Sequence, residues 1–163
     1  MIKIRDARRE DLPAIVALLA DDLLGATREA VGATVAEPYV RAFEAIERDP
    51  NNRMVVAVDA PADDNSDGNA PAIVGCLQIT FIPGLSRQAA TRAQLESVRV
   101  ASARRGQGLG HTLFAWAIEQ ARAHGCAIVQ LTSDKQRESA HRFYESLGFA
   151  ATHEGYKLGL TSG

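Results

Sequence analysis

The part of the sequence best suited to chemistry is a glycine-rich junction between a β-branched run and an amphipathic run. The stretch "VRVASARRGQGLGHTLFAW", residues 98–116, carries the adjacent Arg104 and Arg105 and glycines at 106, 108 and 110. A helix that begins just after Gly106 would present unpaired amides and the positive end of its dipole, and glycine lets an anion approach the backbone. We therefore predict a phosphate site, and the two arginines favour a pyrophosphate.

Two common nucleotide-binding motifs do not fit this junction. A Walker motif needs a Lys-Ser/Thr pair after its glycines to hold terminal phosphates and magnesium, and none stands there. The dinucleotide fingerprint needs a glycine where His111 stands, and Asp134 follows the next strand at the wrong distance. An ordinary glycine-rich turn stays open as an alternative, whereas a nucleotide-binding or nucleic-acid-associated module has little support.

Strand and helix patterns alternate around the junction. The sequence predicts strands over "RAQLESVRV" (92–100) and "AIVQLTS" (127–133), joined by a helix over "GLGHTLFAWAIEQARAHG" (108–125). A terminal helix in "SAHRFYESLGF" (139–149) follows, because apolar side chains recur there at helical spacing. A last strand in "THEGYKLGL" (152–160) would end the domain.

The first half of the chain predicts a strand, two helices and two strands. Their sequences are "IKIRDA" (2–7), "LPAIVALLADD" (12–22), "PYVRAFEAIERD" (38–49), "NRMVVAVD" (52–59) and "AIVGCLQITFI" (72–82). Asp11 precedes the first helix as a candidate cap. The acidic, turn-rich stretch from Asp59 to Pro71 is typical of a solvated loop, and we assign it no function.

Length and composition fit one globular domain over residues 1–163. With 46% hydrophobic residues the chain can bury a sizeable core, and a formal charge of −2 gives no drive toward nucleic acid or acidic membranes. We expect a cytoplasmic protein, because the sequence shows neither the apolar core of a signal peptide nor a membrane span. Cys76 and Cys126 are typical of buried small side chains, and no metal cluster or disulfide framework is indicated.

The run Arg105-Gly106-Gln107-Gly108-Leu109-Gly110 resembles the R-x-x-G-x-G signature of GNAT-type N-acetyltransferases, and like theirs it lies between a strand and a long helix. Upstream, "ESVRV" is similar to the family's fourth strand, and downstream "SAHRFYESLGF" resembles its A-x-x-F-Y-x-x-x-G-F segment. The resemblance is close over residues 92–149 and extends to residues 1–90 only in element order. It implies an α/β fold of GNAT type, with a mixed, mostly antiparallel twisted sheet of about six strands flanked by four helices.

The resemblance also implies acetyl-CoA as co-substrate. In the family the fourth strand splays from the fifth, and its backbone binds the pantetheine arm and the acetyl carbonyl, a role that falls here on Val98, Arg99 and Val100. The pyrophosphate would lie on the loop that follows, whose residues are Arg105, Gly106, Gln107, Gly108, Leu109, Gly110 and His111.

Two residues are candidates for proton transfer. Tyr144 occupies the position of the family's tyrosine general acid, near the coenzyme sulfur, with core packing as the alternative. Glu96 is the candidate base, because strand alternation would place it on one face with Val98 and Val100, with Ser97 and Arg99 on the other. A surface or ion-pair role for Glu96 stays open.

The acceptor pocket of this family is walled by the first two helices and their connection, here residues 21–38. Asp21, Asp22 and Glu29 could attract a cationic amine there, or simply face solvent. We expect a small-molecule amine as acceptor, with a protein N-terminus or lysine as alternatives, and neither nucleic acid nor membrane as partner.

A non-catalytic acetyl-CoA-binding regulatory module is the alternative function. Because the tail is short, a homodimer in which a partner completes the sheet stays open. Arg137 stands where the family commonly has asparagine, and we assign it no role.

Overall fold

The computed structural model describes residues 1–21, 25–27, 29–32, 34–60 and 71–160. They belong to two compact units, Met1–Gln130 and Leu131–Gly163, and each unit is described by itself. One domain over residues 1–163 stays a prediction. The stretch from 61 to 70, where we expected a solvated loop, lies outside the described residues.

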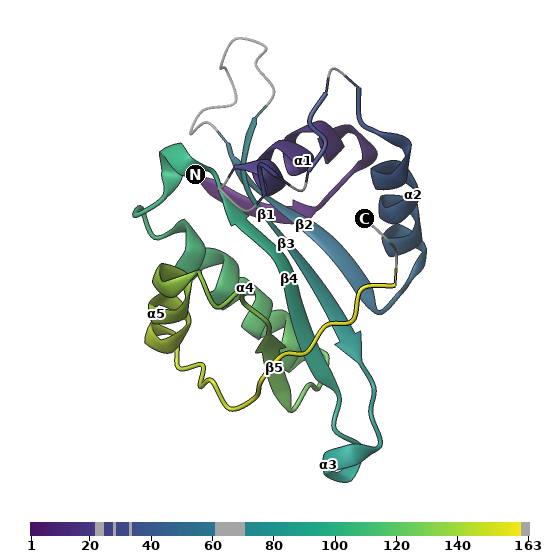
Figure 1. Cartoon of the computed structure of the whole chain (residues 1–163), viewed down its shortest axis with the longest axis vertical. Coiled ribbons are helices and arrows are strands. Elements are labelled where there is room, and N and C mark those ends of the chain that lie inside the picture. The colour runs from purple at the N-terminus through teal and green to yellow at the C-terminus, as the bar shows by residue number, and fades with distance from the viewer. Residues whose placement is uncertain (22–24, 28, 33, 61–70, 161–163) are drawn as a thin grey trace. The chain divides into compact units, whose positions relative to one another are not determined.

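The predicted strands and helices as far as Ser146 are confirmed, with ends that differ by a few residues. In chain order they are β1 (Ile2–Asp6), α1 (Leu12–Ala20), α2 (Glu37–Arg48), β2 (Asn52–Asp59), β3 (Ala72–Ile82), β4 (Arg92–Val100), α4 (Leu109–Ala123), β5 (Ile128–Leu131) and α5 (Glu138–Ser146). Short 3-10 turns at Arg9–Asp11 and Ser102–Arg104 precede α1 and follow β4. A four-residue turn, α3 (Ser86–Ala89), lies at the tip of the β3–β4 hairpin (Figure 1) and was not predicted.

The sheet is mixed, with five strands in the order β1-β2-β3-β4-β5. Strands β1 to β4 are antiparallel neighbours. Strand β5 runs in the same direction as β4, because contacts between the two strands rise together in residue number. The amide of Ala127 donates to the carbonyl of Thr91 (2.9 Å), and Gln130 Nε2 donates to Gln94 Oε1 (2.7 Å). The two strands are therefore parallel and are joined by the crossover helix α4.

Helices cover both faces of the sheet, which explains the unbroken apolar runs of β2 and β3. On one face, called here the α1/α2 face, the side chains of Met54, Val56, Val58 and Cys76 are buried with Leu12, Ile15 and Leu18 of α1 and Phe43 of α2. On the opposite face, α4 packs against β3 and β4 through Leu109, Leu113, Phe114, Ala117 and Ala121. The approach is close at Gly75, where an added Cβ would lie 3.2 Å from the Leu113 side chain.

The second unit contains α5, which ends before Gly148, a residue with the positive φ of 88° that such a helix end requires. The sixth strand that we expected over residues 152–160 is not formed, since these residues have no assigned secondary structure. Two glycines, Gly155 and Gly159, lower the strand propensity of this stretch, and no strand among the described residues pairs with it. Its large side chains, those of Tyr156, Leu158 and Leu160, are exposed.

Candidate functional site

The glycine-rich junction forms an open loop at the start of α4. Gly106 and Gly108 have φ values of 73° and 80°, which favour glycine, and open space surrounds the position of a Cβ at each. The helix begins at Leu109, later than we predicted, because the left-handed Gly108 is its N-cap. By helix geometry the first amides of α4 lack intrahelical acceptors, so the loop and the helix end can take an anion on backbone N–H groups. The residues present therefore fit a coenzyme pyrophosphate.

The two arginines of the loop are already engaged in ion pairs. Arg104 Nη1 lies 2.8 Å from Asp59 Oδ2. Arg105 donates through Nη2 to the backbone oxygen and the carboxylate of Asp21, and through Nε to the Val100 carbonyl. Their charges are therefore compensated within the first unit, and the exposed backbone of the loop is its more direct contribution to anion binding.

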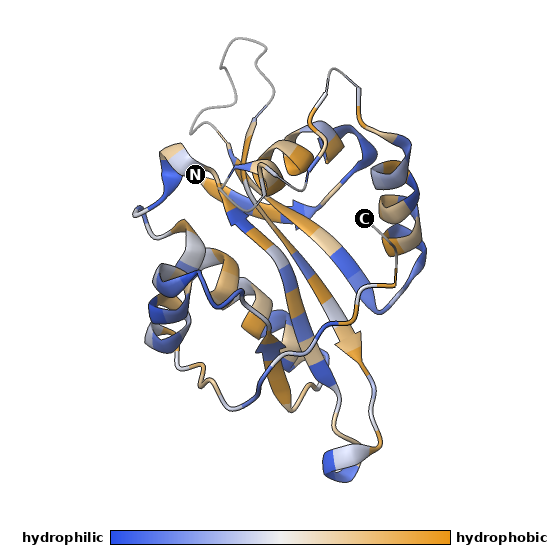
Figure 2. Ribbon diagram, in the orientation of Figure 1, coloured by the Kyte–Doolittle hydropathy of each residue, from blue (hydrophilic) through white to orange (hydrophobic). Residues whose placement is uncertain are grey.

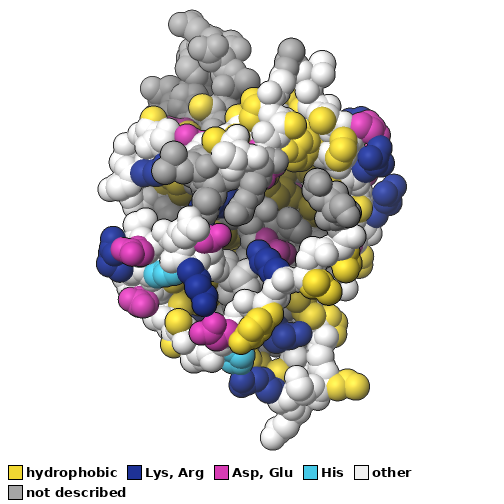
Figure 3. Space-filling model, viewed as in Figure 1, with side chains coloured by type: hydrophobic (Ala, Val, Ile, Leu, Met, Phe, Trp, Pro, Cys, Tyr) yellow, Lys and Arg dark blue, Asp and Glu magenta, His cyan; other side chains and the backbone are white. Residues whose placement is uncertain are grey.

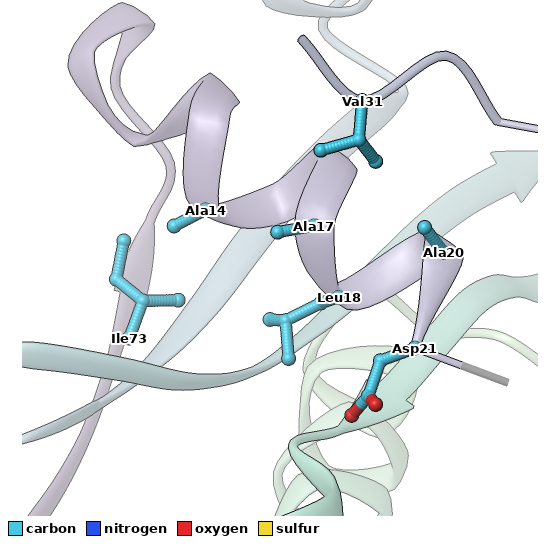
Figure 4. A pocket seen from close by; sticks show the side chains of 7 residues that line it. All are labelled: Ala14, Ala17, Leu18, Ala20, Asp21, Val31 and Ile73. Carbon is cyan, nitrogen blue, oxygen red and sulfur yellow. The ribbon is translucent and has the colours of Figure 1, made fainter. Parts of the chain in front are cut away.

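Asp21 holds the glycine-rich loop through hydrogen bonds from Ser102 and Arg105. Its Oδ2 accepts a 2.7 Å hydrogen bond from the Ser102 amide in addition to the contacts with Arg105, and these residues are more than 80 positions apart in sequence. In Figure 4 Asp21 stands at the end of α1, beside a hollow of about 390 Å³. The hollow is lined by Ala14, Ala17, Leu18, Ala20, Asp21, Val31 and Ile73, a largely apolar set. Of the two roles left open for Asp21, attraction of a cationic amine and exposure to solvent, neither describes its contacts, which are with Arg105 and the Ser102 amide.

The other two acids expected near the acceptor are Glu29 and Asp22. Tyr39 donates a 2.6 Å hydrogen bond from its hydroxyl to Glu29, which raises the pKa of Tyr39 because that bond holds the phenolic proton. Glu29 is thus engaged within the α1–α2 connection, and Asp22 lies outside the described residues. Of the three acids, Asp21 is therefore paired with Arg105 and Glu29 accepts from Tyr39.

A β-bulge in β4 changes which side chains share a face. Gln78 pairs with Glu96, but Cys76 pairs with Arg99, so two steps along β3 match three along β4. Ser97 takes a φ of 52° at this irregularity. Glu96 and Arg99 therefore lie on the same face, whereas Val100 pairs with Gly75 on the other. Our prediction that Glu96 shares a face with Val100 and is opposite to Arg99 was wrong, because strict alternation does not survive a bulge.

Glu96 and Arg99 belong to the α1/α2 face. Their neighbour Cys76 is fully buried there, and burial raises the pKa of its thiol to about 12. The Cys76 thiol donates to the Ser97 carbonyl at the bulge (3.3 Å). Glu96 is exposed, and Arg99 is half-buried with Nη1 donating to the Val98 carbonyl. One acidic and one basic side chain thus stand on the same strand, on the face that α1 and α2 border.

Polar side chains continue from Glu96 across the same face. Asn52 Oδ1 accepts from Gln78 and Thr80 (3.1 Å each), and Gln94 Oε1 accepts from Gln130 (2.7 Å). We call this set, Asn52, Gln78, Thr80, Gln94 and Gln130, the polar row. Figure 2 shows hydrophilic bands among the hydrophobic ones on β3 and β4. The polar row was not predicted, although isolated polar residues at alternate positions of apolar strands were the available signal.

Strand β4 extends beyond β5. Gln130 lies beside Gln94, and β5 ends one residue later, whereas β4 continues for six residues to Val100. The backbone of Val98, Arg99 and Val100 therefore lies past the end of the neighbouring strand, as strand addition by a pantetheine arm would need.

The remaining predicted residues belong to the glycine-rich loop and α4 in the first unit and to α5 in the second. Gln107 closes the loop by donating from Nε2 to the Ala103 carbonyl (3.1 Å), Leu109 is buried, and His111 is exposed in the first turn of α4. Tyr144 is half-buried on α5 in the second unit, with its ring 6.3 Å from that of Phe149 in an edge-on arrangement. The described residues hold no group of three or more His, Cys, Asp or Glu side chains placed for a metal ion. They also form no helix with the length and apolar character to cross a membrane.

Comparisons with known proteins agree with this architecture. A solved structure of a transcriptional regulator from Bacillus halodurans C-125 is 48% identical, with a TM-score of 0.88, covering 98% of this chain and 100% of that one. A proposed acetyltransferase from Agrobacterium tumefaciens strain C58 is 28% identical, with a TM-score of 0.74 and coverage of 96% and 99%.

A curated relative and a family model show to which protein family the chain belongs. The aminoalkylphosphonate N-acetyltransferase of Salmonella typhimurium strain LT2 is 37% identical over 60 residues, a match that spans 37% of this chain and 39% of that protein. The model of the acetyltransferase (GNAT) family matches residues 12–149. This chain belongs to the GNAT acetyltransferase family.

Proposed function

We propose that the protein is an N-acetyltransferase that moves the acetyl group of acetyl-CoA directly to a primary amine of a small molecule. The observation that carries this proposal is the open glycine loop at the start of α4. The loop follows strand β4, which extends past the end of its neighbour β5. Membership of the GNAT family supports it. The curated relative, whose name specifies N-acetylation of aminoalkylphosphonates, supports a small-molecule amine as acceptor.

The chain's own residues would hold the coenzyme at two places. The amides from Gly106 to His111 would bind the pyrophosphate, with Arg105 bracing the loop through Asp21. The backbone of Val98, Arg99 and Val100 would pair with the pantetheine arm and orient the acetyl carbonyl. Acetyl-CoA itself supplies an activated acetyl thioester.

Proton movements complete the transfer. The amine nitrogen forms a bond to the acetyl carbon while the carbon–sulfur bond breaks. Glu96 accepts the proton that the amine loses, directly or through water, and Tyr144 gives its phenolic proton to the leaving sulfur and recovers one from solvent. Glu96 has the exposure that an incoming amine requires. Tyr144, in the second unit, enters this scheme through the family motif.

The test is release of free coenzyme thiol from acetyl-CoA across a panel of amines. We expect Tyr144→Phe to lower kcat by about 10²-fold or more, because general acid catalysis contributes roughly that factor. Tyr156→Phe is the matched control, since this exposed tyrosine of the same unit should leave kcat unchanged. Equal rates for Tyr144→Phe and the wild type would remove Tyr144 from the mechanism.

A second candidate function is a regulatory module that binds acetyl-CoA without turnover. It is favoured by one observation, the description of the 48% identical structural relative as a transcriptional regulator. Saturable acetyl-CoA binding with no thiol release on any amine would favour this candidate over the enzyme.

A further inference from the structure

The two edges of the sheet differ in how they are protected against further strands. Strand β1, at one edge, carries the charged residues Lys3, Arg5 and Asp6. Charges of this kind discourage another strand from pairing with an edge. Strand β5, at the other edge, reads IVQL over Ile128–Leu131, with no charged residue and no proline, and its side chains are half-buried. The β5 edge therefore lacks the charges that guard β1.

The backbone groups that an added strand would meet follow from the pairing of β5 with β4. The Ala127 amide donates toward β4. Because the backbone groups of successive strand residues point to alternate sides, those of Val129 and Leu131 also face β4, and those of Ile128 and Gln130 face outward. In the part of the chain that the structure describes, no strand pairs with this outer side of β5.

The second unit contains a segment that is exposed along its whole length. Every residue from 151 to 160 is exposed, and we call this segment the arm. The side chains of Tyr156, Leu158 and Leu160 are 90%, 85% and 90% exposed. They stand at alternate positions, so all three would share one face of an extended strand. Large apolar side chains that are exposed together mark an interaction surface.

A second copy of this chain offers what both features need. Each copy has one unguarded edge and one arm, so two copies related by a two-fold axis can exchange arms and leave neither feature unpaired. We propose that the protein forms a dimer in which the arm of each copy adds as a strand to the outer side of β5 of the other copy. This inference goes beyond the proposed function and does not depend on it.

The first test is the molar mass of the full chain, measured by light scattering over a dilution series. We expect the concentrated wild type to have twice the monomer mass of 17.5 kDa. The arm variant, Leu158→Ser combined with Leu160→Ser, removes two of the exposed apolar side chains. It should raise the dimer Kd by at least about tenfold, because those side chains would be buried between the copies.

The matched control is Leu85→Ser. Leu85 is 95% exposed as well, but it lies beside α3 at the tip of the β3–β4 hairpin. This variant should dimerise as the wild type does. A wild type that is monomeric throughout the series overturns the inference, and so does an arm variant that dimerises like the wild type.

Hydrogen exchange at single amides, followed by NMR, tests the strand pairing itself. The outward-facing amides of Ile128 and Gln130 should exchange at least about tenfold faster in the arm variant than in the wild-type dimer, because they lose their acceptors. Those of Val129 and Leu131, which face β4, should change less. Equal exchange of the outward-facing amides in both proteins overturns the inference. A wild-type monomer in which these amides are protected also overturns it, because the arm would then cover the edge of its own copy.

Discussion

Asp11 is the charged side chain that the described residues bury most completely, at 4% exposure. We expected it to cap α1, but it makes no side-chain cap bond to that helix. Its carboxylate instead accepts from both Nη atoms of Arg5 (2.6 and 3.0 Å) and from the Arg8 amide (2.7 Å). Burial raises the pKa of Asp11, but the bonds to Arg5 and Arg8 outweigh it, and the net pKa is lowered.

Asp11→Asn should therefore lower the free energy of unfolding at neutral pH by about 2 kcal/mol, the scale of hydrogen bonds to charged groups. Because the folded pKa is depressed, this contribution is present above the ordinary carboxyl pKa of about 3.9 and is lost as pH falls through the folded value. Urea unfolding at pH 7 and near pH 3 measures it. Asp6→Asn is the control, because the Asp6 carboxylate that pairs with Arg53 is exposed. Its loss of unfolding free energy should stay below about 1 kcal/mol. Equal losses for the two variants would contradict the assignment.

The element that we propose for binding the pyrophosphate of the coenzyme is the start of α4, where Gly108 has a φ of 80°. Gly108→Ala should cost about 1–2 kcal/mol of stability through the left-handed conformation and should weaken acetyl-CoA binding. Gly125→Ala is the matched control, because Gly125 has a φ of 73° and open space but follows the other end of the helix. The two variants should have similar stability, but acetyl-CoA affinity measured by calorimetry should be lower only for Gly108→Ala. Equal affinities would remove the loop conformation from coenzyme recognition.

Local pattern predicted most elements, because β-branched runs and helical apolar spacing are properties of consecutive residues. Local pattern could not predict the bulge at Ser97, because strand register depends on which residues of β3 lie opposite β4. It could not predict the pairing of Asp21 with Arg105 either, because these two residues are distant in sequence. The turn α3 was missed as well, because Arg87, Gln88 and Ala89 adopt positive φ without glycine. The glycine loop could be predicted because its motif is contiguous.

Acidic and basic residues are nearly equal in number in the whole sequence, 20 against 18. Figure 3 shows acidic and basic side chains interspersed on the face in view, in keeping with the formal charge of −2. Both arginines of the glycine loop also have acidic partners, Arg104 with Asp59 and Arg105 with Asp21. The proposed recognition of an anionic coenzyme therefore relies on local backbone geometry and not on a general positive field.

Ligand-dependent stability of the full chain tests that conclusion. A ligand that binds only the folded state stabilises it by about 2.7 kcal/mol at one hundred times its Kd. Acetyl-CoA and coenzyme A should both raise Tm in thermal unfolding, because the proposed contacts to pyrophosphate and pantetheine are common to them. NAD and ATP at the same concentration should raise Tm less, since they lack the pantetheine arm that β4 would pair with. Moderate salt should reduce the coenzyme effect only slightly if backbone amides in a fixed loop dominate. Stabilisation by NAD or ATP with none by acetyl-CoA would refute the coenzyme assignment, whatever the acceptor.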